Sequence, residues 1–172
     1  IAVMPCGPAP VDLRAFCEAL ASALAPWRPL LVGRRYVEER LDAAEAGATA
    51  RVHMGEPLAR LLESLEREHP LLVLVTDEDN SPWTRRCLRQ ADRILYVAGG
   101  GGDAALSEME QSLNAQGVFN PMVRAELVRV LPDDARAPSG TLAWLTPRRI
   151  DAHHHVRLGV PSDFARLARR VT

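Results

Sequence analysis

Two uninterrupted apolar runs in the middle of the chain constrain its fold more than any other feature. Leu71–Val75 reads LLVLV and Ile94–Ala98 reads ILYVA, and neither run alternates with polar residues. A strand that is apolar on both sides is typical of a parallel sheet whose two faces are covered by helices. The two runs therefore predict buried strands of an α/β domain.

The segment between these strands reads as a turn followed by a helix. Asp77–Asn80 places three acidic residues and an asparagine directly after the first run. Ser81 and Pro82 match the N-cap and first-turn positions of a helix over Trp83–Gln90. Open α/β sheets bind ligands beyond the carboxyl ends of their strands, so we first look for a site at this turn.

Strand and helix patterns alternate along the rest of the chain. With 172 residues, 47% of them hydrophobic, the chain has the size and composition of a single globular domain over 1–172. The alternation predicts a three-layer, Rossmann-like α/β fold in which helices cover both faces of a mostly parallel sheet. Further strands are expected at 1–4, 30–32, 125–131 and 151–158, the last as a strand or an extended segment. Helices are expected near 16–24, 34–41, 56–68, 104–114, 140–145 and, capped by Ser162, 163–170, with a loop over 42–54.

The loop after the first strand stands where a nucleotide-binding fold would hold its phosphates. It contains Gly7 and three prolines, Pro5, Pro8 and Pro10. Proline has no N–H to donate to a phosphate, and the chain has no lysine, because all 21 of its basic residues are arginine. The loop therefore lacks the groups that a phosphate site uses.

The acidic turn has two interpretations. Asp77 and Asp79 could hold a magnesium ion at the end of an apolar strand, as the acidic residue of a nucleotide hydrolase does. Acidic residues after a strand are also common turn formers that interact with the amino end of the next helix. We favour the structural role, because the chain offers no phosphate loop to share the ion.

The helix after this turn carries an aromatic residue and three arginines, Trp83, Arg85, Arg86 and Arg89. Guanidinium groups can hold a phosphate or a carboxylate through paired hydrogen bonds. They can equally form a solvated face that pairs with Glu78, Asp79 or Asp92. We favour a surface of ion pairs between domains over a small-molecule site.

A run of three histidines lies near the end of the chain. In an extended segment Asp151, His153 and His155 share one face and form a possible ligand set for zinc or iron. Histidines of such a segment more often bond to neighbouring backbone groups, so we expect no metal and no cofactor. The segment His153–Arg157 is instead a candidate docking surface.

Charge and cysteine content exclude several classes of function. The net charge of −1 gives no support to nucleic-acid binding, and no apolar run is long enough to cross a bilayer. Cys6, Cys17 and Cys87 show no C-x-x-C spacing, which indicates reduced thiols and a cytoplasmic location. Because the chain starts at Ile1, inside an apolar run, we expect a domain excised from a longer, multidomain polypeptide.

Several strings resemble one family. Ser81–Asp92 (SPWTRRCLRQAD), Ile94–Ala98, Gly140–Leu145 and His153–Leu158 resemble the region before the catalytic domain in bacterial relatives of neuropathy target esterase. The resemblance implies a parent that joins cyclic-nucleotide-binding-like modules to a patatin-like phospholipase domain. The G-x-S-x-G serine of that domain is absent here, so the resemblance assigns no catalytic residue to this chain.

The layout is similar, more distantly, to the MinD/ParA-type partitioning ATPases. The segment from Asp77 to Ala98 keeps the aspartate, the arginine-rich helix and the following strand of that pattern, whereas the phosphate loop is lost. The resemblance implies a degenerate P-loop relative that connects other domains.

We therefore expect a non-enzymatic regulatory or scaffolding domain of a patatin-like phospholipase. Its partners would be the esterase domain and the cyclic-nucleotide-binding-like domain of the same parent, with membrane association only through that parent. A nucleotide-binding switch at the loop 5–10 and Asp77, and a metal-binding module at the histidine run, are the alternatives.

Overall fold

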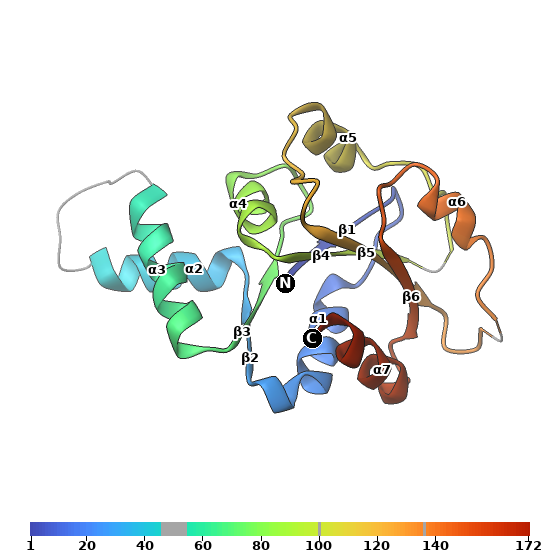
Figure 1. Ribbon diagram of the computed structural model, residues 1–172, viewed down its shortest axis with the longest axis horizontal. Coiled ribbons are helices and arrows are strands. Elements are labelled where there is room, and N and C mark those ends of the chain that lie inside the picture. Colours follow the sequence, from blue (N-terminus) through green and yellow to red (C-terminus); the bar gives the residue numbers. More distant parts are fainter. Residues whose placement is uncertain (46–54, 100, 136) are drawn as a thin grey trace.

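Six parallel strands form one sheet in the computed structural model, which describes residues 1–45, 55–99, 101–135 and 137–172. The strand order is β2-β3-β1-β4-β5-β6, and every neighbouring pair is parallel. The strands are β1 (Ala2–Pro5), β2 (Pro29–Val32), β3 (Leu71–Val75), β4 (Arg93–Gly99), β5 (Arg124–Leu131) and β6 (Ala152–Arg157). The expected three-layer, parallel α/β architecture is confirmed (Figure 1).

Helices cover both faces of this sheet (Figure 1). One face packs against α1 (Leu13–Ala23) and α7 (Pro161–Val171), whose Phe16 and Phe164 rings lie 5.5 Å apart. The helices packed with the other face are α2 (Arg34–Glu45), α3 (Gly55–Glu68), α4 (Pro82–Gln90), α5 (Glu108–Ala115) and α6 (Thr141–Leu145), and a 3-10 turn, η1 (Ala25–Trp27), follows α1.

The central strands are apolar on both sides because each side faces a separate core. Along β4, Ile94, Tyr96 and Ala98 belong to the α3–α5 core, whereas Leu95 and Val97 belong to the α1–α7 core. This double burial is what the uninterrupted apolar run predicted.

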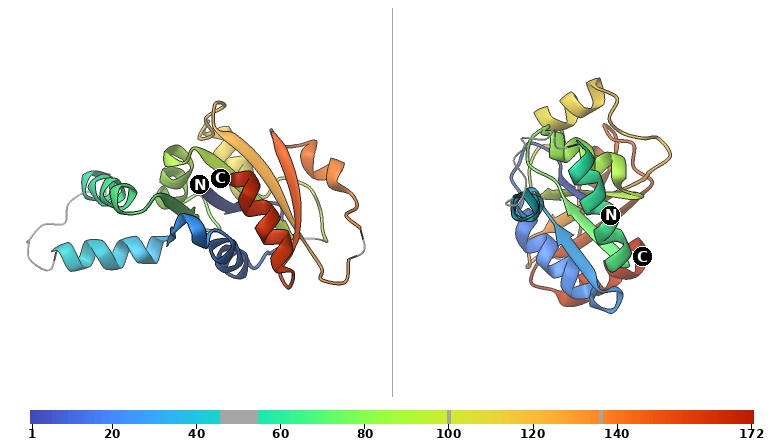
Figure 2. Two further views of the ribbon diagram at one scale, coloured as in Figure 1. Left: turned by 60° about the horizontal axis from the view of Figure 1, so that its bottom comes forward. Right: turned by 90° about the vertical axis from the view of Figure 1, so that its left-hand side faces the viewer.

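The α2–α3 pair projects beyond the β2 edge, and the two chain ends lie close together in all views (Figure 2). Several helix boundaries differ from the sequence prediction. α5 begins at Glu108 rather than 104, because Ser107 caps it and forms a capping box with Glu110. Ser162 does not cap α7, since Val160 occupies the N-cap position and Pro161 begins the helix. α2 continues to Glu45, and the rest of the loop expected over 42–54 lies outside the described residues.

Asp163, in the first turn of α7, binds the edge strand β6. Its side chain is 6% exposed and accepts hydrogen bonds from the Arg157 backbone N–H (3.2 Å) and the Arg157 Nε (2.8 Å). Arg166 Nη2 donates to the same carboxylate at 3.0 Å. The hydrogen bond from Arg157, together with that from Arg166 and their charges, holds the pKa of Asp163 below its usual value despite burial.

This carboxylate is expected to contribute pH-dependent stability. Asp163→Asn should lower the free energy of unfolding at neutral pH by about 1–2 kcal/mol, because two partly exposed arginines lose their acceptor. A carboxylate whose pKa is lower in the folded than in the unfolded chain stabilises the fold at pH values above its unfolded pKa. This stabilisation is lost as the pH falls through the folded pKa. Urea unfolding from about pH 5 to about pH 3 should therefore show a shallower decline for Asp163→Asn than for wild type. Ser162→Ala serves as the control and should unfold like wild type at both ends of this range.

Candidate functional site

The turn after β1 is the position at which a P-loop fold holds phosphate. Gly7 adopts a left-handed conformation (φ 78°), and its N–H donates to Glu110 Oε2 at 2.8 Å. A Cβ on Gly7 would lie 2.6 Å from the Trp144 ring, so the turn packs directly against this indole. The backbone amide of the turn is thus already bonded and covered by groups of the chain itself.

Glu110 lies at the centre of a buried cluster that we call the Glu110 cluster, formed with Gly7, Ser107 and Arg148. Arg148 Nε donates to Oε1 at 2.7 Å, and Arg148 Nη2 donates to Oε2 at 3.0 Å. The Ser107 N–H donates to Oε2 at 2.9 Å. Both ion-pair side chains are 2% exposed, so this salt bridge is buried. The remaining guanidinium hydrogens of Arg148 bond to the carbonyl oxygens of Ala104, Ala105 and Trp144.

The donors of the Glu110 cluster are of the kind that binds a phosphate. A turn amide, a helix-start amide and a cation commonly converge on an anion in nucleotide sites. Here the anion that they bind is a side-chain carboxylate. The amino end of α1 is similarly satisfied, because Asp12 caps it and accepts the Ala15 N–H at 2.9 Å.

Trp144 covers the Glu110 cluster from α6. Its side chain is buried, and the guanidinium carbons of Arg129 and Arg148 lie 5.6 Å and 5.2 Å from its ring. Cations stacked on an indole are stabilised by the charge distribution of the ring. Beside the cluster, burial raises the pKa of the Cys6 thiol to about 12, and the Glu110 charge adds to this effect.

The acidic turn after β3 is held by hydrogen bonds within the turn and α4. Asp77 Oδ2 accepts from Ser81 Oγ at 2.6 Å, and the Asp77 N–H donates to Thr84 Oγ1 at 3.2 Å. Arg34 Nη1 lies 3.5 Å from the same carboxylate. Asp79 is exposed to solvent. The predicted N-cap at Ser81 is confirmed, since its side chain accepts the Thr84 N–H. Asp77 therefore links the turn to the start of α4 and to Arg34.

The arginines of α4 surround a hollow of about 280 Å³, which we call the α4 hollow. Its floor is formed by Val37, Leu58 and the buried Trp83, whose Nε1 donates to Val75 O at 2.8 Å. Four arginines, Arg34, Arg85, Arg86 and Arg89, also line the hollow, together with one acidic residue, Glu38. The hollow thus combines an apolar base with a cationic border.

The alternative in which Arg85 and Arg89 pair with Glu78, Asp79 or Asp92 is not seen among the described residues. Arg85 Nη1 lies 3.4 Å from both Asn80 Oδ1 and Gln116 Oε1, which are neutral acceptors. Within the described residues, neither arginine forms an ion pair, and the Arg86 Nε is buried without a hydrogen-bond partner. These cations are therefore not neutralised by the turn that precedes them.

The histidine run forms strand β6, and its side chains alternate between the two faces. His153 and His155 share one face with their rings 5.6 Å apart, and His155 Nε2 lies 2.8 Å from Thr141 Oγ1. Burial, with the nearby charges of His153 and Arg129, lowers the pKa of His155. Asp151 does not join them, because its carboxylate accepts the Ala125 N–H at 2.8 Å. Across the described residues, no three potential ligands converge on a metal position, so the ligand set of Asp151, His153 and His155 is not assembled.

The two predicted docking segments lie on different parts of the molecule. α4 packs beside β3, whereas β6 forms the far edge of the sheet (Figure 1). Arg157 turns toward α7 and bonds to Asp163. The Trp83–Arg89 helix and the His153–Arg157 strand therefore form two separate surfaces.

Sequence reasoning missed Glu110, Arg148 and Trp144 as the groups that occupy the loop after β1. The string Ser107-x-x-Glu110 is a capping-box signal that marks the start of α5. No local pattern indicates that the same carboxylate reaches Gly7, which is 103 residues away in sequence.

Comparison with known proteins identifies the family of this domain. Residues 1–161 match the family model described as the Neuropathy Target Esterase family P-loop like domain. The chain belongs to this family. The resemblance seen in the sequence is thereby confirmed, and the Glu110 cluster describes how the P-loop position is filled in this member.

Relatives of this P-loop like domain are long proteins. A Patatin-like phospholipase domain-containing protein of Caenorhabditis elegans is 33% identical over 158 residues, which cover 91% of this chain and 11% of the relative. Patatin-like phospholipase domain-containing protein 6 of Homo sapiens is 33% identical over 161 residues, again 91% and 11%. Lysophospholipase NTE1 of Yarrowia lipolytica is 32% identical over 120 residues, which cover 63% of this chain and 8% of the relative.

The chain thus spans about a tenth of the length of the curated relatives that it matches. None of the solved structures matches it. Among the described residues, no helix has both the length and the apolar character needed to span a bilayer.

The buried ion pair of the Glu110 cluster is expected to be essential for stability. Glu110→Gln removes the counter-charge of Arg148 inside the domain and should lower the free energy of unfolding by about 3–5 kcal/mol. Glu108→Gln, on the exposed side of the same helix turn, is the matched control and should cost less than about 0.5 kcal/mol. Urea unfolding followed by circular dichroism measures both. Equal stability of Glu110→Gln and wild type would contradict the role assigned to this pair.

Proposed function

We propose that this P-loop like domain is a non-catalytic regulatory or scaffolding domain of a patatin-like phospholipase. Its proposed role is to dock against the esterase domain and to transmit changes from cyclic-nucleotide-binding-like modules of the same parent. The Glu110 cluster carries this proposal, because it fills the position that nucleotide chemistry would need. The family and the phospholipase names of the relatives support the parent.

The occupied turn after β1 favours the scaffolding role over the nucleotide switch. A nucleotide would have to displace the Glu110 carboxylate from Gly7 and Arg148, and to move the Trp144 ring away from the turn. Breaking a buried ion pair costs several kcal/mol, and the three prolines of the loop offer no replacement amides. No catalytic role is therefore assigned to any residue of the chain.

The α4 hollow is the proposed contact with the esterase domain. Its apolar floor suits an inserted apolar side chain, and its arginine rim suits acidic groups around that side chain. Because Arg85 and Arg89 have no ion pair within the described residues, a carboxylate on the partner would gain charge-assisted hydrogen bonds without breaking an existing salt bridge. The His153–Arg157 strand is proposed as a second, separate docking surface.

A cytoplasmic location fits the thiols. Cys6, Cys17 and Cys87 are free and buried, and burial raises the pKa of all three, so they are poor nucleophiles. Three unpaired thiols are typical of a reducing compartment. Any membrane association is proposed to come through the parent.

Calorimetric titration tests the absence of a nucleotide switch. ATP or GTP with magnesium, added to the chain up to about 1 mM, should give no heat beyond dilution, since the Glu110 cluster occupies the turn. Titration of the same magnesium-containing buffer without nucleotide serves as the baseline. Saturable heat from either nucleotide would show that the turn opens, and would favour the switch over the scaffold.

Charge reversal on α4 tests docking in the full-length parent. The double variant Arg85→Glu and Arg89→Glu should change esterase activity or its regulation by about fivefold or more, because the cationic rim repels its acidic partner. The matched control, Arg67→Glu with Arg169→Glu, changes the same charge on exposed positions outside the hollow and should behave like wild type. Unchanged activity, regulation and stability of the α4 variant would contradict the docking role.

A further inference from the structure

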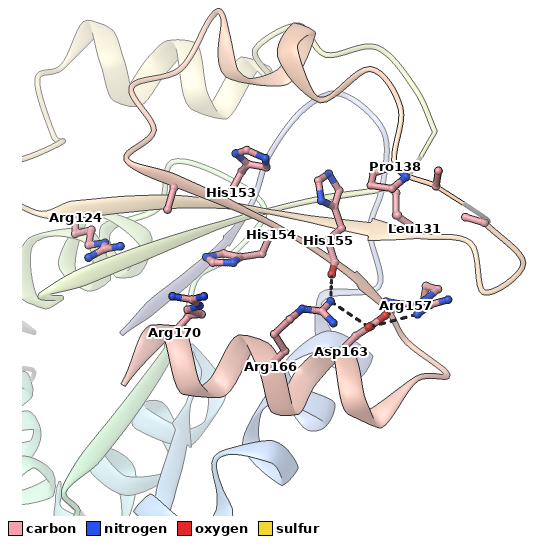
Figure 3. Close-up of a pocket in the computed structure, with 13 residues that line it drawn as sticks. Arg124, Leu131, Pro138, His153, His154, His155, Arg157, Asp163, Arg166 and Arg170 are labelled. Carbon is pink, nitrogen blue, oxygen red and sulfur yellow. Dashed lines mark hydrogen bonds and ion pairs between the residues drawn. The ribbon is translucent and has the colours of Figure 1, made fainter.

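The edge strand β6 borders a cleft of about 610 Å³, which we call the β6 cleft. The cleft follows the outer side of the strand, between α7 and the loop after β5 (Figure 3). His153 and His155 project to one side of the strand, and His154 projects to the side of Arg166 and Arg170 (Figure 3).

Side chains of α7 already occupy part of the backbone edge of β6. Arg166 Nη2 donates to His155 O at 3.0 Å, and Asp163 accepts the Arg157 N–H at 3.2 Å. An incoming strand would have to break these bonds before it could pair with the edge at residues 155–157. Recognition in the β6 cleft therefore depends on side chains more than on strand addition.

The cleft carries an excess of positive charge. Arg124, Arg157, Arg166 and Arg170 line it, whereas Asp163 is the acidic residue that lines it. Asp163 is balanced by Arg157 and Arg166, and the buried Glu126 behind the cleft is bonded to Arg93, Arg124 and His154. Burial would raise the pKa of Glu126, but the His154 hydrogen bond and the arginine charges hold it low.

Arg170 is the cation that these carboxylates do not neutralise. It is exposed, and it has no ion-pair partner among the residues that the structure describes. Arg166 precedes it by one helical turn, so the two side chains leave α7 about 6 Å apart. Alternate side chains of an extended polypeptide repeat at about 7 Å, which matches this spacing.

We infer that the β6 cleft binds an extended polypeptide segment with carboxylates at alternate positions. The groove along the strand supplies the shape, and Arg170 with Arg166 supplies the charge. The inference rests on the proposed docking role of His153–Arg157 and adds the chemistry of the partner.

A membrane surface fits the cleft less well. Peripheral membrane sites combine basic residues with aromatic or long apolar side chains that enter the lipid. The apolar residues that line the cleft are Leu131, Ala135, Ala137, Pro138 and Ala152. Over the described part of the chain, the exposed large apolar residues Trp27, Met122 and Leu142 lie outside the cleft lining.

Fluorescence polarisation with the 172-residue chain tests this inference. The probe is a short fluorescein-labelled peptide of alternating glutamate and alanine, with an alternating lysine and alanine peptide as the control. At about 0.15 M salt, the acidic peptide should bind with a Kd below about 1 mM, and the basic peptide should not bind. Absence of binding by the acidic peptide would overturn the inference.

Two charge reversals on α7 distinguish binding in the β6 cleft from nonspecific electrostatic attraction to the protein surface. Arg170→Glu should weaken peptide binding about fivefold or more, because it places a carboxylate opposite those of the peptide. Arg169→Glu makes the same change on an exposed residue of the same helix outside the cleft lining, and should weaken binding less than about twofold. Both positions are exposed, so thermal unfolding should be unchanged for each variant.

Equal weakening by the two variants would overturn the inference, as would binding to phosphatidylserine vesicles in place of the peptide. The outcome is independent of the esterase assay on α4. Peptide binding, with unchanged esterase activity of the α4 variant, would support binding in the β6 cleft and contradict the α4 contact. Altered esterase activity of the α4 variant, with no peptide binding, would support the α4 contact and contradict binding in the β6 cleft.

Discussion

The carboxylate of Glu110 connects parts of the domain that are distant in sequence. It accepts hydrogen bonds from the turn after β1, from the start of α5 and from Arg148, which follows α6. Arg148 in turn bonds to carbonyl groups of the segment before α5. A buried ion pair is tolerated only when its hydrogen-bonding groups are satisfied, and this pair meets that condition through the loops at the carboxyl edge of the sheet. The geometry of the segments that follow β1, β4 and β5 therefore depends on this interaction.

The same interaction explains how a P-loop architecture persists without the residues of a phosphate site. The turn after β1 leaves the Gly7 N–H inside the domain, and a buried N–H needs a hydrogen-bond acceptor. Glu110 provides that acceptor, and Arg148 provides the charge that a lysine would otherwise supply. The prolines on either side of Gly7 are compatible with this arrangement, because one amide of the turn is sufficient.

Sequence reasoning identified the architecture well because the information for it is local. The apolar runs at Leu71–Val75 and Ile94–Ala98, and the cap at Ser81, lie where the structure has β3, β4 and the start of α4. The predicted start of α5 near 104 is too early, because Ser107 caps the helix and the first helical residue is Glu108. The expected cap at Ser162 was wrong because a proline at 161 already begins α7.

The filling of the phosphate position was less accessible from the sequence. Gly7 and Glu110 are far apart along the chain, and Glu110 and Arg148 are 38 residues apart, so no periodic pattern joins them. The absence of lysine and the presence of three prolines indicate that the loop lacks the groups of a phosphate site. Only the folded arrangement shows what replaced it. For the two candidate docking surfaces the sequence identified the residues, whereas their separation on opposite parts of the sheet is a property of the strand order.

The tethering of Glu110 to its own fold has a consequence for cellular behaviour. An intramolecular group competes with free solutes at a high effective concentration that does not vary with metabolism. A related fold that binds phosphate from solution reports the energy state of the cell, because its occupancy follows nucleotide supply. In this chain the Glu110 carboxylate holds the corresponding position, so a phosphate from solution would have to compete with a group that is always present beside the turn.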